Sequence, residues 1–96
     1  MSGTATQARE ALVSANRVRM ARAQIKRDIA AGKVTVPEVL GLPDLARMTL
    51  GELLAAQHGW GPRRVARFLN ALDLTVAKRI GSLTERQRGV IAGELA

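Results

Sequence analysis

The chain has 96 residues, which is room for one domain, and its composition excludes several classes of protein. It has no cysteine and its one histidine is His58, which excludes a disulfide framework, a thiolate metal site and a cluster of histidine ligands. Fifteen Lys and Arg against eight Asp and Glu give a net charge of +7, which is typical of nucleic-acid-binding domains.

Hydropathy argues for a folded chain without a membrane segment. Hydrophobic residues make up 47% and aromatic residues 2%, so we expect an aliphatic core. No apolar run approaches the roughly 18 residues that span a bilayer, and the N-terminus lacks the apolar block of a signal peptide. We therefore expect a cytoplasmic protein with no membrane partner.

The first predicted element is a helix from Thr4 to Ala31, with Gly32 as its stop. One face carries the apolar residues Leu12, Ile25 and Ile29, and another carries Arg19, Arg22 and Lys26. Residues 1–7 are small and polar and should fray. A helix this long exceeds the width of a small domain, so its N-terminal half should project from the core.

Short helices should follow. Thr35 precedes Val36-Pro37-Glu38 and is a helix cap for a segment that ends at Gly41. A further turn should run from Pro43 to Arg47. Thr49 and Glu52 have the spacing of a capping box, and the helix that they begin should end near His58-Gly59.

The segment Gly59-Trp60-Gly61-Pro62-Arg63-Arg64 should connect that helix to the next one, which runs to about Leu72. Helical spacing assigns Val65, Phe68, Leu69 and Leu72 to the core, and directs Arg63, Arg64, Arg67 and Asn70 to the surface.

The C-terminal part should contain two more helical segments. One turn is expected over Val76–Ile80, and Thr84 with Gln87 should cap a last helix that carries Val90, Ile91 and Leu95. The sequence therefore predicts an all-α fold of five to six helices. We divide it into a long basic N-terminal helix with a frayed start (residues 1–34) and a compact helical part (residues 35–96).

Charge is concentrated in two blocks. Residues 1–33 carry a net charge of +5, residues 34–58 a net charge of −2, and residues 59–96 a net charge of +4. Twelve of the fifteen basic residues are arginine, whose guanidinium group can pair with a phosphate through two hydrogen bonds. A solvated basic surface without a ligand is the alternative interpretation of the charge.

The connection at Gly59-Trp60-Gly61 has the features of a phosphate site. Glycines admit positive φ angles and leave room for a ligand to approach the backbone. A helix that begins at Pro62 presents free amide groups at a positive dipole end, and Arg63 and Arg64 add full charges there. The alternative is a tight turn whose glycines serve only geometry. Trp60 either covers the core or touches a ligand, and core packing is the favoured interpretation.

A second basic loop surrounds Gly81-Ser82, with Lys78, Arg79, Arg86 and Arg88 on either side. The Ser82 hydroxyl and the start of the last helix are candidate donors to a phosphate backbone. The alternative here is a solvated charged loop.

Several of these segments resemble one family from about Ala8 to Leu95. They are the basic helix Arg17–Lys26, the Val39-Leu40 step, Met48–Leu54, Gly59–Arg64 and Arg79–Arg88, of which the last is the most specific. The chain is similar to the actinobacterial integration host factor of the mycobacterial and streptomycete type, a small all-α nucleoid-associated protein. That family is unrelated to the α/β heterodimer of the same name.

The resemblance implies a helix–two-turns–helix element that binds double-stranded DNA with little sequence preference. It assigns DNA contacts to three places: the long helix (Arg17, Arg19, Arg22, Lys26), the two-turn loop (Gly59, Trp60, Gly61, Arg63, Arg64) and the loop before the last helix (Lys78, Arg79, Ser82). The chain departs from the family at Gly81, where another arginine is common, and at Pro62, which removes one amide.

We therefore expect a monomeric, nucleoid-associated, DNA-architectural protein with no catalytic residues, metal, cofactor or small-molecule substrate. The alternative is an RNA- or ribosome-binding module, although the chain offers few aromatic side chains for base stacking. A DNA-repair lyase would need an additional catalytic domain and a nucleophilic amine. A helical adaptor is disfavoured because Val13, Met20 and Ile25 do not sustain a heptad.

Overall fold

Helices and short 3-10 turns make up the regular structure of the described residues. The computed structural model describes the backbone of residues 2–95 and the side chains of residues 8–95. Its elements are α1 (Ser2–Ala30), α2 (Val36–Val39), the 3-10 turn η1 (Pro43–Leu45), α3 (Leu50–Ala55), α4 (Pro62–Ala71), the 3-10 turn η2 (Ile80–Ser82) and α5 (Glu85–Leu95). No strand forms within residues 2–95, where Thr49 and Arg79 make one isolated antiparallel bridge. The prediction of an all-α fold is confirmed.

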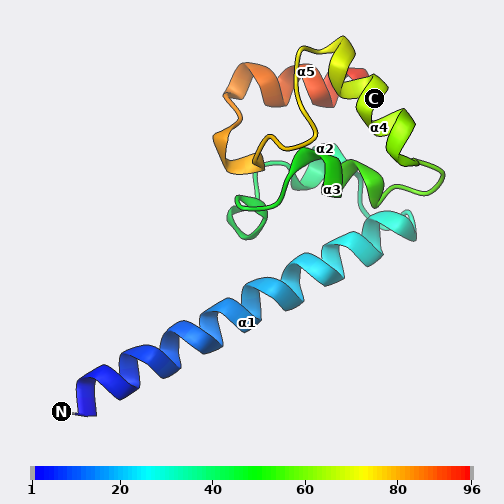
Figure 1. The fold of residues 1–96 in the computed structure, drawn as a ribbon. Coiled ribbons are helices and arrows are strands. Elements are labelled where there is room, and N and C mark those ends of the chain that lie inside the picture. The colour runs from blue at the N-terminus through cyan, green and yellow to red at the C-terminus, as the bar shows by residue number, and fades with distance from the viewer. Residues whose placement is uncertain (1, 96) are drawn as a thin grey trace.

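The long helix α1 projects from the rest of the molecule (Figure 1). At 1.5 Å per residue its 29 residues span about 43 Å. The molecule measures 53 × 27 × 21 Å, and its radius of gyration is 15.5 Å, against about 12.5 Å for a compact domain of this length. The predicted projection of its N-terminal half is confirmed.

The apolar stripe predicted for α1 is confirmed at Ile25 and Ile29 and wrong at Leu12. Ile29 is buried and Ile25 packs against the core, whereas Leu12 is 63% exposed. The helix extends past the compact part before it reaches Leu12, so that side chain has no core to contact. The expected fraying of residues 1–7 stays a prediction: Met1 lies outside the described residues, as do the side chains of residues 2–7. The division at residues 34 and 35 likewise stays a prediction.

Gly32 ends α1 as predicted, through a Schellman motif. It has φ +76°, a conformation that glycine adopts without a steric penalty. The Lys33 amide donates to the Asp28 carbonyl at 2.8 Å, and the Gly32 amide donates to the Ile29 carbonyl at 3.1 Å. The chain can therefore reverse direction and start α2 beside α1.

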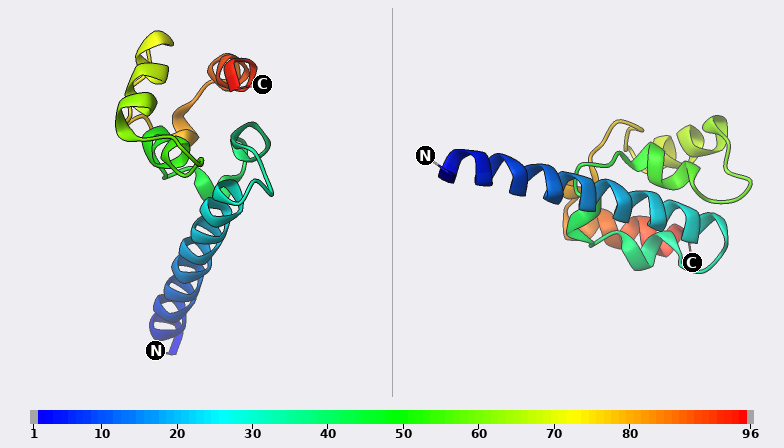
Figure 2. Two further views of the ribbon diagram at one scale, coloured as in Figure 1. Left: turned by 90° about the vertical axis from the view of Figure 1, so that its right-hand side faces the viewer. Right: turned by 90° about the horizontal axis from the view of Figure 1, so that it is seen from below.

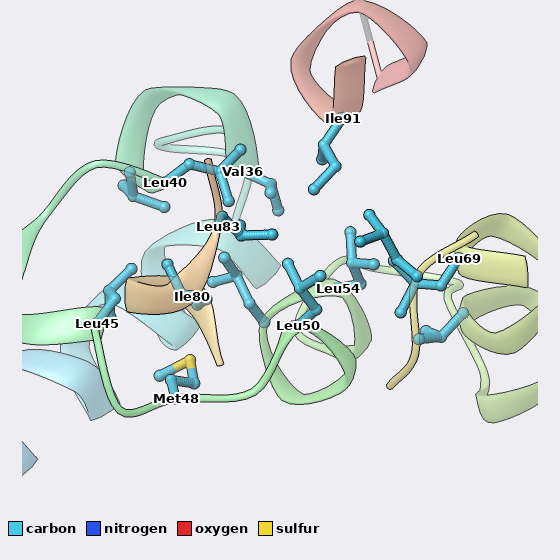
Figure 3. Packing of buried hydrophobic residues seen from close by; sticks show 14 of the residues in the cluster. Val36, Leu40, Leu45, Met48, Leu50, Leu54, Leu69, Ile80, Leu83 and Ile91 are labelled. Atoms are coloured by element: carbon cyan, nitrogen blue, oxygen red, sulfur yellow. The ribbon is translucent and has the colours of Figure 1, made fainter. Parts of the chain in front are cut away.

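Two helix pairs lie above the C-terminal half of α1. α3 packs against α4, and α2 packs against α5; Figure 2 shows the two pairs on opposite sides of the compact part. Between them the aliphatic side chains converge (Figure 3). The largest fully buried ones are Val36, Leu45, Met48, Leu50, Leu53, Leu54, Leu69, Ile80 and Ile91. The core is thus aliphatic, as the composition predicts.

The predicted faces of the last two long helices are largely correct. In α4, Val65 and Leu69 are buried, and Phe68 and Leu72 pack against the core. In α5, Ile91 is buried, whereas Val90 is 43% exposed because it lies about 100° around the helix from Ile91.

Helix caps follow the predicted spacings with two exceptions. Thr84 and Gln87 form a reciprocal capping box, with bonds of 2.9 and 3.1 Å. Thr49 accepts from the Glu52 amide at 3.2 Å, but the Glu52 carboxylate binds Lys26 instead of completing the box. Thr35 lies at the N-cap of α2 without a side-chain bond.

Two predicted boundaries are wrong. α3 ends at Ala55 rather than near His58-Gly59, because the Ala56 and Gln57 amides bond three residues back and tighten the chain into turns. Residues 76–79 are not helical, because the segment bonds with residues 46–51 instead. The helical turn there comes later, at Ile80–Ser82.

Among the described residues, no helix combines the length and the apolar character needed to cross a bilayer.

Replacing Leu69 with alanine should lower the free energy of unfolding by about 2–5 kcal/mol, because the side chain is fully buried. Urea unfolding followed by circular dichroism measures the loss. The matched control is Leu12→Ala on the projecting part of α1, which should change stability by no more than about 0.5 kcal/mol. Equal effects of the two substitutions would contradict the core assignment.

Candidate nucleic-acid interface

The connection between α3 and α4, residues 56–61, forms two consecutive turns. The Ala56 amide donates to the Leu53 carbonyl, and the Trp60 amide donates to the Gln57 carbonyl, each at 3.2 Å. The Gln57 side chain also donates to the Leu54 carbonyl at 3.1 Å. These bonds occupy the carbonyls at the end of α3 and hold the loop in one conformation.

The two glycines of this loop serve different purposes. Gly59 has φ +78°, which a residue with a Cβ adopts only under strain. Gly61 is extended, with φ −78° and ψ 174°, and is the N-cap of α4. A Cβ at either position would meet no atom within 4 Å. The loop therefore presents open backbone to solvent, and only Gly59 requires glycine for its conformation.

The first turn of α4 has unsatisfied donors. Gly61 has no side chain to cap the helix, and Pro62 at its first position has no N–H. The amides of Arg63 and Arg64 precede the first intrahelical bond, which Val65 makes to the Gly61 carbonyl at 3.1 Å. Both arginine side chains are exposed. This helix start therefore combines free amides, the dipole and two guanidinium groups.

Trp60 is held by α4 rather than presented to solvent. Its ring meets Phe68 edge to face, with ring centroids 5.3 Å apart and an interplanar angle of 77°. The guanidinium carbon of Arg64 lies 4.3 Å from the ring centroid of Trp60, a cation–π geometry. Trp60 is half-buried and packs against the core, in agreement with the favoured interpretation. The stack fixes the loop to α4 and orients Arg64.

The second predicted loop, residues 78–82, is tied to the start of α3. The Leu50 amide donates to the Lys78 carbonyl at 2.8 Å, and the Ile80 amide donates to the Met48 carbonyl at 2.9 Å. The Arg79 guanidinium donates to the Arg47 carbonyl. Arg79 is exposed and Lys78 is half-buried. This loop and the two-turn loop thus lie at the two ends of α3, whose six residues span about 9 Å.

Ser82 is tied into its own loop. Its hydroxyl donates to the Arg79 carbonyl at 2.8 Å, so a bond from this hydroxyl to a phosphate, which stays a prediction, would replace the bond to Arg79. The bond tightens η2 and supports the backbone that carries Arg79.

Gly81 has a structural reason to be glycine. A Cβ there would lie 2.8 Å from the Cβ of Ala46 and 3.0 Å from its carbonyl oxygen. The Gly81 amide donates to that same carbonyl at 2.8 Å. The two backbone segments approach so closely that any side chain at this position would require one of them to shift.

Three of the four basic residues predicted on α1 form ion pairs with the compact part. Lys26 Nζ lies 3.1 Å from Glu52 Oε1, Arg22 lies 3.9 Å from the same carboxylate, and Arg17 lies 3.4 Å from Asp44 Oδ2. Arg19 bonds the neutral side chain of Asn16. The ion pairs tie α1 to the compact part, and the helical pattern did not predict this pairing with Asp44 and Glu52.

Arg47 joins this group although it was not among the predicted contacts. It lies with Arg19 and Arg22 around one hollow. It is the only basic residue between positions 34 and 58. Its isolation there is the one feature of the sequence that points to a role for this arginine.

A comparison with solved structures identifies the fold of the chain. No family model matches the chain, and no curated protein matches it. A solved structure of sIHF bound to an 8-base-pair palindromic DNA matches with a TM-score of 0.77 at 21% sequence identity. The match covers 86% of this chain and 98% of the sIHF chain. The chain therefore shares the fold of the sIHF chain over 86% of its length.

Replacing Gly59 with alanine should lower stability by about 1–2 kcal/mol, because alanine resists a positive φ. Gly61→Ala is the matched control two residues away, because the backbone angles of Gly61 suit alanine. Alanine lowers the conformational entropy of the unfolded chain, which stabilises the fold, and it is a poorer helix cap, which destabilises the fold. These two effects should offset each other to within about 0.5 kcal/mol. Thermal unfolding of both variants measures the difference, and a Gly61→Ala loss as large as that of Gly59→Ala would refute the loop geometry.

Proposed function

We propose that the chain binds double-stranded DNA through its phosphate backbone and minor groove, with little sequence specificity, as a DNA-architectural protein. The observation that carries the proposal is the shared fold with sIHF, which was solved bound to DNA. In this chain the two-turn loop of that fold ends at a helix start with free amides and two exposed arginines, which is a favourable site for a phosphate.

The first proposed contact is made by Gly59, Trp60, Gly61, Arg63 and Arg64. The open glycine backbone lets a DNA strand approach the α4 amides closely. Arg63 supplies an exposed charge, whereas Arg64 is held over the Trp60 ring. Trp60 thereby acts as a positioning residue, since its ring is engaged by Arg64 and Phe68 rather than displayed for insertion between bases.

The second proposed contact is made by Lys78 and Arg79, with Ser82 acting through the loop backbone. The two contacts lie at opposite ends of α3, so one duplex could meet both. Arg17, Arg19, Arg22 and Lys26 on α1 extend the basic surface. Phosphates there would compete with Asp44 and Glu52 for Arg17 and Lys26, and the exchange of one anion for another lowers the net gain in affinity.

The finer assignments belong to the same proposal. We propose that the chain is an integration host factor of the actinobacterial type, a cytoplasmic nucleoid-associated protein that acts as a monomer and is not an enzyme. Its net charge of +7 supports an anionic polymer as its partner.

RNA binding is the alternative that the same charges allow. Sequence-specific RNA recognition relies on exposed aromatic side chains that stack on bases. The two aromatic residues of this chain are Trp60 and Phe68, and both pack against the core. This arrangement favours duplex DNA.

Binding of random-sequence duplex DNA should weaken steeply with salt. If about six to eight phosphates are neutralised, the slope of log K against log salt concentration is about −5 to −7. Fluorescence anisotropy over a range of salt concentrations measures it, with structured RNA as competitor. A flat salt response would contradict phosphate-dominated binding, and preferential competition by RNA would support the alternative.

Replacing both Arg63 and Arg64 with alanine should weaken DNA binding by at least about tenfold and make the salt slope shallower by about two, because two charged phosphate contacts are lost. Arg63 is exposed, and the stacking of Arg64 on Trp60 contributes only about 0.5–1 kcal/mol at an exposed site, so the helical circular-dichroism signal should persist. Arg9→Ala is the charge control: Arg9 is exposed in the N-terminal half of α1, the half that extends away from the compact part (Figure 1). Comparing the DNA affinity of Arg9→Ala with that of Arg63→Ala alone separates the effect of position from the effect of losing one charge. Equal losses of affinity in the two variants would refute the two-turn contact.

A further inference from the structure

A hollow of about 700 Å³ lies between α1 and the connection that joins η1 to α3. We call it the Arg47 hollow. Its lining consists of Ala11, Ser14, Ala15 and Val18 and the three arginines Arg19, Arg22 and Arg47. No function discussed so far uses it as a unit, and Arg47 has no role in the two loops described above beyond its backbone carbonyl.

The arginines reach the hollow from two elements. Arg19 and Arg22 are three residues apart on α1 and therefore lie on one side of the helix. Arg47 comes from the connection between η1 and α3, on the opposite wall. Ala11, Ser14 and Ala15 line the same hollow with small side chains, and they are exposed, as are Arg19 and Arg47, so the hollow is open to a ligand from solvent.

The charge in the hollow is poorly compensated. Arg22 approaches Glu52 only to 3.9 Å, and the other oxygen of that carboxylate binds Lys26 at 3.1 Å. Arg19 bonds the uncharged Asn16 side chain. Among residues 8–95, no carboxylate lies within ion-pair distance of Arg19 or Arg47. Three guanidinium groups thus share part of one negative charge, and an added anion would be stabilised by all three.

The hollow adjoins the second proposed DNA contact. The Arg79 guanidinium donates to the carbonyl of Arg47, and the Gly81 amide donates to the carbonyl of Ala46 at 2.8 Å. A strand of nucleic acid held at residues 78–82 would therefore pass beside Arg47.

We propose that Arg47, together with Arg19 and Arg22, binds a backbone phosphate of the same duplex that contacts residues 78–82. The inference rests on the proposed function and deepens it. It makes Arg47 a DNA contact, and it ranks the basic residues of α1: Arg19 and Arg22 act directly, whereas Arg17 and Lys26 chiefly hold α1 through Asp44 and Glu52. A phosphodiester is the ligand because its oxygens accept from several guanidinium forks at once.

The test measures DNA affinity and salt slope for Arg47→Ala. We expect about tenfold weaker binding and a slope shallower by about one. Arg47→Lys should recover part of the affinity, since it keeps the charge but not the paired donors. Arg79 uses the Arg47 backbone carbonyl, which remains in Arg47→Ala, so loss of binding cannot be ascribed to loss of that bond.

Arg9→Ala is the control for the loss of one charge and should change affinity by less than about twofold. If wild-type protein binds DNA and Arg47→Ala behaves like Arg9→Ala, the Arg47 inference is wrong while the proposed function stands. If wild-type protein does not bind duplex DNA, both are wrong.

Inorganic phosphate distinguishes a free ion from a phosphate of the DNA backbone. In calorimetric titrations, wild-type protein should show no Arg47-dependent binding of inorganic phosphate at micromolar concentration, because a single small anion lacks the neighbouring contacts at residues 78–82. Micromolar binding that disappears in Arg47→Ala, with unchanged DNA affinity, would assign the hollow to free phosphate and overturn the inference.

Discussion

The arrangement of the basic groups depends on one set of backbone hydrogen bonds. Residues 46–51 and 76–81 are joined by four of them, with lengths between 2.8 and 3.0 Å. They return the chain from the end of α4 to the start of α3 and so place Lys78 and Arg79 one short helix away from the two-turn loop. The segments can approach this closely because Gly51 and Gly81 lack side chains: a Cβ at Gly51 would lie 3.0 Å from Val76, and one at Gly81 would meet Ala46.

Local patterns predicted the helices that local interactions stabilise. The apolar spacing of α4 and the capping box of α5 depend on residues three or four positions apart, and both were read correctly from the sequence. The pairing of residues 76–81 depends on partners about 30 positions earlier, so the turn expected at Val76–Ile80 was wrong. Leu12 was misplaced for a related reason: helical periodicity says which side chains share a face, but not where the partner surface ends.

The candidate interface, like the fold, is predictable from the sequence where it depends on local interactions and not where it depends on tertiary contacts. The exposed arginines at the α4 start follow from helix geometry and the preceding Gly-x-Gly. The hydrogen bond of Ser82 to Arg79 and the ion pairs of α1 require tertiary structure. Those ion pairs give Asp44 and Glu52 a structural role. They hold the long helix to the compact part with charges that are individually weak at an exposed surface, and a nucleic-acid backbone could replace them.

We expect one DNA duplex to contact the molecule at both ends of α3. Amide chemical-shift mapping by NMR, with a short random-sequence duplex added to the isotope-labelled protein, tests it directly. The largest shifts are expected at residues 59–64 and 78–82, with little change at Gly89 and Gly93 on α5. Shifts concentrated on α5, with both loops unperturbed, would contradict it.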